Sequence, residues 1–288
     1  MTICELVENI NNNAGEIEQI TDSAQASIAL IKISGTTVYK QQEDGSLVYN
    51  QEEMDKLGSQ LQALVEQGIM PIIIHGGGNL IDYYSKAAGL EVVKVGGSRY
   101  TDRQTLEGAV LPAISDINEK IVQMLIDYGL HPASTYRIFG AEQVKRKDLG
   151  YVGTIKSVNS ALLTNMLYFG QVPVIACIGY NEAGQAYNIN ADKCAAALAE
   201  ALQPGYVFMI TSTGGIKDKD GRIIETATPQ QLDELIAAGT ITDGMQMKAE
   251  QSKKMIAAGL EKIYILDTDS IAGAASGNGA RSYTIVRA

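Results

Sequence analysis

Apolar and polar residues follow two patterns along the chain, short apolar runs and longer amphipathic stretches. Four mainly apolar runs indicate buried strands, at residues 27–33, 70–74, 173–177 and 206–211. Residues 51–67 carry apolar side chains at helical spacing, which predicts an amphipathic helix. Further helices are predicted at about 80–88, 103–128, 161–169 and 191–202. Continuous apolar strands between helices indicate a mainly parallel sheet that is covered on both faces.

The remaining predicted strands lie at residues 136–139, 151–158, 262–266 and 282–286, and a charged hairpin at 145–148 separates the first two. Thr228 is followed by Pro229 and, at the third helical position, by Gln231, which predicts a capped helix start. Asp243 is expected to cap the next helix. Ligands of parallel sheets bind outside the carboxyl ends of the strands, so the loops that follow the buried strands are the places to look for a site.

Composition narrows the class of protein. The 288 residues include 23 Lys and Arg against 33 Asp and Glu, a formal net charge of −10, which argues against a nucleic-acid partner or an anionic membrane surface. The length suits one large domain or two smaller ones. No apolar run reaches the roughly 18 residues of a membrane helix. Residues 1–25 contain no Lys or Arg, so we expect no targeting peptide. Three well-separated cysteines (Cys4, Cys177 and Cys194) form no disulfide framework, and a cytoplasmic location is expected.

Glycine-rich loops follow three of the predicted strands. Ser34 and Gly35 follow the first, residues 75–78 (HGGG) the second, and residues 212–215 (STGG) a third. Glycine lets the backbone approach a ligand closely, and a helix N-terminus offers free N–H groups to an anion. One such loop alone is better explained as a tight turn, whereas three in one chain favour an anionic ligand. The loops match neither standard nucleotide-binding glycine motif.

Several polar residues near these loops are candidates for chemistry. Lys32 lies inside an apolar strand, where a charge is costly unless paired or functional; the alternative is an edge-strand lysine that limits aggregation. The guanidinium of Arg99 suits a carboxylate, although it could be a solvated loop arginine. Residue type alone favours a surface lysine at Lys248. At Asn190 or Asp192, a role as helix cap explains the residue type just as well as a functional role does.

Taken together, these segments resemble the amino acid kinase family, and within it most closely the N-acetylglutamate kinases. The matching motifs, in family order over roughly residues 27–266, are IKISG (31–35), HGGGNLI (75–81), GSRYTD (97–102), YVGTIKSVN (151–159), NINAD (188–192), TSTGGI (211–216) and ITDGMQMK (241–248). The resemblance implies an α/β fold, a three-layer αβα sandwich with an open, mainly parallel sheet. It implies one domain over residues 1–288, with an acyl-amino-acid lobe that also makes dimer contacts (1–180) and a nucleotide lobe (181–288).

The implied activity is ATP-dependent phosphorylation of the γ-carboxylate of N-acetyl-L-glutamate, a step of arginine biosynthesis. The family pattern assigns catalysis to Lys32, Lys248 and Asp192: the lysines neutralise the transferring phosphoryl group and the aspartate holds them. It assigns substrate binding to Gly77, Gly78, Arg99 and Asn188. It assigns nucleotide binding to Gly35, Thr211, Ser212, Thr213, Gly214, Gly215, Ile216, Lys217, Thr240, Ile241 and Thr242. Because the carboxylate attacks directly, no protein nucleophile is needed, and Mg²⁺ would be carried by ATP phosphates and water rather than by protein ligands.

Departures from the family pattern keep two alternatives open. Ser34 stands where the family usually has Gly, and Ser212 stands where it usually has Asp. One alternative is a related kinase of a carrier-linked amino-acid carboxylate, which residues 99–107 (RYTDRQTLE) also resemble; the intact NINAD favours a free substrate instead. The other is a catalytically weak paralogue that senses a ligand. The resemblance implies a homodimer, while a hexamer joined through an N-terminal helix (Ile3, Leu6, Val7 and Ile10) and arginine control are left open.

Overall fold

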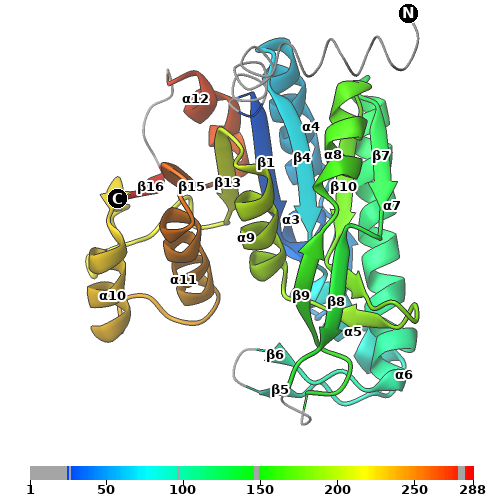
Figure 1. The fold of residues 1–288 in the computed structure, drawn as a ribbon. Helices are drawn as coiled ribbons and strands as arrows, with labels where there is room; N and C mark the ends of the chain where they lie inside the picture. Colours follow the sequence, from blue (N-terminus) through cyan, green and yellow to red (C-terminus); the bar gives the residue numbers. More distant parts are fainter. Residues whose placement is uncertain (1–24, 26, 96–97, 146–148, 278–282) are drawn as a thin grey trace, which may run out of the picture.

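The fold is organised around one large, mainly parallel sheet (Figure 1). The computed structural model describes residues 25, 27–95, 98–145, 149–277 and 283–288. Neighbouring strands of the sheet run parallel except for the antiparallel pair β15–β16, which confirms the predicted sheet. In spatial order its eight strands are β14 (Thr226–Ala227), β16 (Thr284–Arg287), β15 (Lys262–Leu266), β13 (Tyr206–Ile210), β1 (Ile28–Ile33), β4 (Met70–His75), β10 (Val172–Ala176) and β7 (Pro132–Thr135).

Helices cover both faces of this sheet, so its central strands are buried on both sides. All six residues of β1 and all five of β10 are buried, which explains why their sequences are apolar except at Lys32. One face is covered by α4 (Gln51–Glu66), α5 (Gly78–Ala87), α7 (Leu111–Asp127) and α12 (Ile271–Ser276). The other is covered by α8 (Ser160–Tyr168), α9 (Ala191–Leu202), α10 (Pro229–Ala237) and α11 (Asp243–Ala257) (Figure 1). The expected three-layer αβα sandwich is therefore confirmed.

The remaining described strands form one smaller sheet and two hairpins. A second sheet has the order β12 (Ala186–Asn188), β11 (Ile178–Tyr180), β8 (Phe139–Gln143) and β9 (Gly153–Val158). Two hairpins pair β2 (Tyr39–Gln41) with β3 (Leu47–Tyr49), and β5 (Lys94–Val95) with β6 (Ser98–Arg99). Short helices are α3 (Gly35–Val38), α6 (Arg103–Thr105) and the 3-10 turn Thr268–Ser270. The β5–β6 hairpin lies with α5 at the lower end of the molecule in Figure 1.

Some predicted elements differ from the observed ones. Residues 136–138 are not a strand: the chain leaves the large sheet at Thr135 and enters the small sheet at Phe139, so this segment connects two sheets. The predicted helix at 103–128 contains a π-helical turn (Leu106–Val110) between α6 and α7, just before Pro112, which has no N–H to donate. Residues 146–148 of the predicted charged hairpin, Ser282 of the last predicted strand, and the N-terminal positions of Ile3, Leu6, Val7 and Ile10 lie outside the described residues.

The two predicted helix caps have different outcomes. Thr228 and Gln231 form the reciprocal capping box at the start of α10, as predicted. Asp243 is not the cap of α11: Thr242 holds the extended N-cap position, and Asp243 itself is the first helical residue with φ at 49°. A cap residue needs extended backbone geometry, and only Thr242 has it. Among the described residues, no helix is long and apolar enough to cross a membrane.

Candidate active site

Lys32 stands near the carboxyl end of β1, in the middle of the large sheet. Its strand lies between β13 and β4, and Lys32 is level with Met209 and Ile74 on those strands. The interpretation of Lys32 as an edge-strand lysine is therefore wrong. The residue is only 4% exposed, so its ammonium group needs a partner inside the protein.

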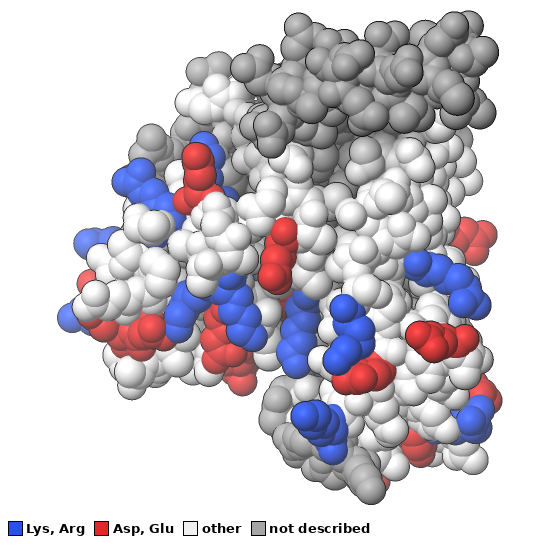
Figure 2. Space-filling view, viewed as in Figure 1, with Lys and Arg blue, Asp and Glu red and all other residues white. Residues whose placement is uncertain are grey.

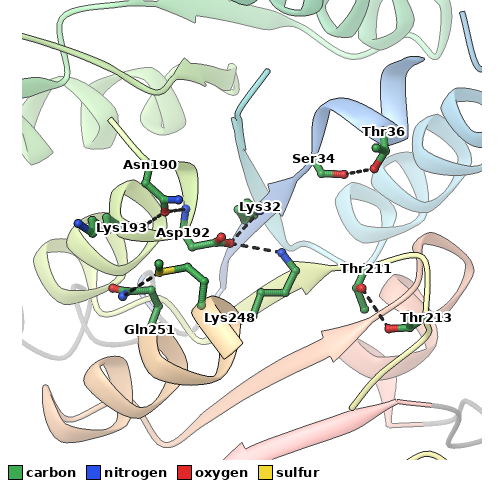
Figure 3. A network of polar contacts seen from close by, with 11 residues as sticks. Lys32, Ser34, Thr36, Asn190, Asp192, Lys193, Thr211, Thr213, Lys248 and Gln251 are labelled. Atoms are coloured by element: carbon green, nitrogen blue, oxygen red, sulfur yellow. Dashed lines mark hydrogen bonds and ion pairs between the residues drawn. The ribbon is translucent and has the colours of Figure 1, made fainter. Parts of the chain in front are cut away.

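Asp192 is that partner, and it binds Lys248 as well. Its Oδ1 lies 2.8 Å from the Nζ of Lys32 and 3.4 Å from the Nζ of Lys248, so two ammonium groups converge on one carboxylate (Figure 3). The three residues come from β1, α9 and α11, and all three are buried. Lys248 is thus not the surface lysine that its residue type favoured, because α11 packs against α9 and turns it inward.

Local structure explains where Asp192 lies. Asn190 is the N-cap of α9, and its side-chain oxygen accepts hydrogen bonds from the backbone N–H groups of Asp192 and Lys193 (Figure 3). The capping function is therefore carried by Asn190. Asp192, the second residue of the helix, is left free to bind the lysines.

The charges in this cluster shift one another's pKa. Burial alone would raise the pKa of Asp192, but the two ammonium groups outweigh it and hold this pKa below its usual value. Burial disfavours charge on Lys32 too, yet the adjacent Asp192 holds its pKa above the ordinary range. For Lys248, burial and then the charge of Lys32 lower the pKa to about 8. With both lysines protonated, the cluster carries one surplus positive charge.

A cavity of about 400 Å³ opens beside this cluster. Seven of the predicted site residues line it: Lys32, Gly35, Gly77, Gly78, Arg99, Asn188 and Asp192. They come from four separate stretches of sequence, residues 32–35, 77–78, 99 and 188–192, which the fold brings together around one cavity. Lys248 does not line the cavity itself but reaches its wall through Asp192.

The end of the cavity that holds the HGGG loop is built to receive an anion. Gly77 is the N-cap of α5, and a side chain there would press on Ile114, Ile117 and Ile81 at 3.2–3.4 Å. The guanidinium of Arg99 lies over this helix start and donates to the carbonyl oxygen of Gly78 at 3.1 Å. Free N–H groups at the start of this ten-residue helix, together with a fixed guanidinium, favour a carboxylate.

Neighbouring residues fix the shape of the cavity. The side-chain amide of Asn188 donates to the hydroxyl of Thr101 at 3.2 Å, which joins β12 to the start of α6. At Gly35, a Cβ would lie 2.2 Å from the Oδ1 of Asn79, so a larger residue would have to displace the Asn79 side chain. The hydroxyls of Ser34 and Thr36 hydrogen-bond to each other at 2.5 Å beside it (Figure 3).

Apart from Gly35, the residues predicted to bind nucleotide are all described by the structure, and none of them lines the cavity. Residues 211–217 follow β13, the neighbour of β1, and Thr240, Ile241 and Thr242 precede α11. Ile216 and Ile241 are buried, whereas Ser212, Thr213, Lys217 and Thr242 are exposed. Gly214 and Gly215 are also buried, and Thr211 hydrogen-bonds to Thr213. Nucleotide binding by these residues stays a prediction.

Two features of the site were not expected from the sequence. The first is Lys94, which lines the cavity and lies opposite Arg99 on the β5–β6 hairpin. The signal that could have indicated it is a lysine between two valines, just before two glycines.

The second is Cys177, which also lines the cavity and contacts Cys194 in α9. Burial and then this contact raise the pKa of the Cys194 thiol well above its usual value. These cysteines are 17 positions apart in sequence, and no spacing motif joins them.

Comparisons with known proteins agree with this architecture. The model of the amino acid kinase family matches residues 27–267. The acetylglutamate kinase of Sulfurihydrogenibium sp. (strain YO3AOP1) is 36% identical over 222 residues, which cover 69% of this chain and 74% of that protein. The acetylglutamate kinase of Aquifex aeolicus (strain VF5) is 29% identical over 243 residues, 77% of this chain and 82% of that protein.

Solved structures share the fold. The smu.665 protein from Streptococcus mutans UA159 has a TM-score of 0.76 at 25% identity, covering 91% of this chain and 99% of that one. N-acetylglutamate synthase from Neisseria gonorrhoeae, solved with coenzyme A and N-acetyl-glutamate, has a TM-score of 0.77 at 20% identity, covering 96% of this chain and 63% of that one. The chain therefore belongs to the amino acid kinase family, as a kinase that is similar in sequence to the acetylglutamate kinases.

Proposed function

We propose that this protein transfers the γ-phosphoryl group of ATP to the γ-carboxylate of N-acetyl-L-glutamate, giving N-acetyl-L-glutamyl 5-phosphate and ADP. The observation that carries the proposal is the convergence of Lys32 and Lys248 on Asp192 at the wall of a cavity that Arg99 also lines. Two cationic sites on one cavity suit a substrate with two carboxylates. One carboxylate is gripped at Arg99 and the other faces the lysines.

The chemistry follows from charge and position. A γ-carboxylate oxygen forms a bond to the γ-phosphorus, the bond from phosphorus to the β,γ-bridging oxygen breaks, and ADP leaves with that electron pair. No proton has to move and no side chain has to act as a nucleophile. Lys32 and Lys248 neutralise charge that repels the two anionic reactants, and Asp192 keeps both ammonium groups in place before substrate arrives.

The charged nucleotide would bring its own cation. Among the described residues, no group of three or more His, Cys, Asp and Glu side chains could hold a metal ion. Asp192, the carboxylate that lines the cavity, is already occupied by two lysines. These residues do not form a metal cage, so Mg²⁺ is expected on ATP phosphate oxygens and water.

In this proposal, one half of the chain binds mainly the acid and the other half binds the nucleotide. Gly77, Gly78 and Arg99 belong to residues 1–180, the acyl-amino-acid lobe, although Asn188 joins them from beyond that boundary. Residues 181–288 supply Lys248 and the loop after β13, and form the nucleotide lobe. Placement in arginine biosynthesis, a cytoplasmic location and a homodimer belong to the same proposal, on the strength of the family resemblance.

ADP release in the presence of ATP and Mg²⁺ tests the proposal. The purified protein is assayed with N-acetyl-L-glutamate, with free glutamate, aspartate and 2-aminoadipate, and with an acidic carrier protein that bears a C-terminal glutamate. Turnover with N-acetyl-L-glutamate at least about tenfold above the others supports the proposal. Preference for the carrier would replace it with the carrier-linked kinase. Calorimetric binding of N-acetyl-L-glutamate without ATP binding or turnover would replace it with the ligand sensor.

A further inference from the structure

Asp82 stands behind the acid-binding end of the cavity, on the second turn of α5. One of its carboxylate oxygens, Oδ1, forms an ion pair with the Nη1 of Arg99. The other, Oδ2, lies 3.3 Å from the Nζ of Lys94. Lys94 and Arg99 are direct partners on the two strands of the β5–β6 hairpin. A single carboxylate therefore links both strands of this hairpin to the body of the protein.

The two cations line the cavity, whereas Asp82 does not. A carboxylate inside the cavity would repel an anionic substrate. Placed behind the cations, it holds them without meeting the substrate itself. This placement makes Asp82 a support for its two partners.

Arg99 depends on this support more than Lys94 does. The Arg99 side chain is 9% exposed, and that of Lys94 is 57% exposed. A guanidinium removed from water is costly without a paired charge. With Asp82 on one nitrogen and the Gly78 carbonyl on another, Arg99 is fixed against the first two turns of α5.

The hairpin has little structure of its own to fix these side chains. Each of its strands has two residues, and a lone two-stranded hairpin is marginal in water. Next to Arg99, the backbone N–H of Tyr100 donates to the carbonyl oxygen of Val93, and the hydroxyl of Thr101 donates to the carbonyl oxygen of Arg99. These bonds hold the backbone, whereas the links to α5 hold the two cationic side chains at the cavity.

We propose that Asp82 is a positioning residue, which holds Arg99 and Lys94 over the start of α5 so that together they receive the α-carboxylate of the acid substrate. The three side chains carry a net charge of +1, which matches one carboxylate. Lys94 is in this arrangement a second substrate-binding cation. The substrate part of this inference rests on the proposed function; the fixing of Arg99 by Asp82 does not.

Steady-state kinetics of Asp82→Asn tests the inference, because the amide keeps the shape and removes the charge. The expected result is a rise of roughly tenfold or more in KM for the acid, with kcat and KM for ATP changed by less than about twofold. Lys94→Met is expected to raise the same KM by a smaller factor, because Asp82 still holds Arg99. Glu142→Gln, which breaks the exposed pair with Lys156, is the matched control and should change nothing.

A second measurement needs no substrate. The side-chain N–H signals of Arg99, assigned in ¹⁵N spectra by their loss in Arg99→Lys, should be protected from water exchange in the wild type and averaged with solvent in Asp82→Asn. Unchanged protection, or a KM for the acid that Asp82→Asn leaves unaltered, would overturn the positioning role. Equal falls in kcat and thermal stability without a change in KM would point to a purely structural residue. Absence of turnover in the wild type would count against the proposed function alone, because the exchange measurement still reports on Asp82.

Discussion

A buried lysine in a central strand is the residue on which this site depends. An ammonium group in the interior costs several kcal/mol unless it is paired, and Lys32 is paired with Asp192. Lys248 shares the same carboxylate oxygen, so Asp192 cannot neutralise both lysines. The free protein therefore keeps an uncompensated positive charge at the cavity wall, which an incoming phosphate can neutralise.

Replacing Lys32 tests this role directly. Lys32→Met is expected to lower kcat by about a hundredfold to a thousandfold, the size of effect seen when one preorganised charge stabiliser is removed. The fold should persist, because Asp192 keeps its pair with Lys248. Lys156→Met, at an exposed lysine, is the control. Steady-state ADP release and thermal melting give the two readouts; turnover within about twofold of wild type would remove Lys32 from catalysis.

The lowered pKa of Lys248 predicts a pH dependence. Burial and the charge of Lys32 bring this pKa to about 8, so the ammonium of Lys248 loses its proton as pH rises through 8. If the charged form is the active one, kcat/KM should fall above pH 8, since this ratio reports the free enzyme. In Lys248→Arg the guanidinium stays protonated, and the fall near pH 8 should disappear from whatever activity remains. A profile that is flat from pH 7 to 9 in the wild type would contradict this assignment.

At the scale of elements, the N-cap of α9 couples helix stability to the position of Asp192. Asn190→Ala removes a cap and is expected to lower the free energy of unfolding by about 1 kcal/mol. It should lower kcat too, because Asn190 binds the backbone N–H of Asp192 and itself lines the cavity. Thr228→Ala removes a cap from α10 at a similar cost, with no contact to the site. Equal kcat values for the two variants would show that the cap does not position Asp192.

Much of the architecture could be predicted because the relevant signals are local. Mainly apolar runs identify β1, β4, β10 and β13, since a strand covered on both faces favours apolar residues; Lys32 in β1 and His75 in β4 are the exceptions. Glycines that follow these strands indicate that the candidate site lies at the carboxyl ends of the strands. The capping box at Thr228 also lies within four residues and was predicted correctly.

The features that could not be predicted are pairings between distant residues. Residue type alone favoured a surface lysine at Lys248, because nothing near it in sequence indicates that α11 packs on α9; only the family resemblance placed it with Lys32 and Asp192. The contact of Cys177 with Cys194 and the bridge from Asp82 to Lys94 and Arg99 likewise arise only when separate elements meet. Residues 136–138 were mistaken for a strand because this Tyr-Arg-Ile connection between two sheets has residue types that are common in strands.

At the scale of the whole molecule, the proposed function requires the protein to bind two anions although its own net charge is −10. Basic and acidic side chains are interspersed over the face drawn in Figure 2, so no broad positive surface is seen there. Attraction of anions must therefore come from a few cationic groups at short range, because distance and salt screen the other charges of the protein. Arg99, Lys94 and Lys32 line the cavity, and Lys248 reaches its wall through Asp192.

The C-terminal strand, β16, contacts the loop after β13, which is distant from it in sequence. β16 runs between β15 and β14, and the hydroxyl of its first residue, Thr284, accepts a hydrogen bond from the backbone N–H of Ile216 at 2.8 Å. Thr284 is fully buried, and it also limits the space at Gly215. The end of the chain thus fixes the loop after β13, to which we assign nucleotide binding.

Thr284→Val tests this long-range support, because valine keeps the shape of the side chain and removes the acceptor. The buried N–H of Ile216 would lose its partner, which should lower the free energy of unfolding by about 1–3 kcal/mol. If the loop binds nucleotide, KM for ATP should rise while KM for the acid stays constant, since the acid-binding groups lie on other strands. Thr164→Val, at an exposed hydroxyl on α8, is the matched control. A rise in KM for the acid as large as that for ATP would mean that the C-terminal strand supports the whole cavity rather than the nucleotide loop.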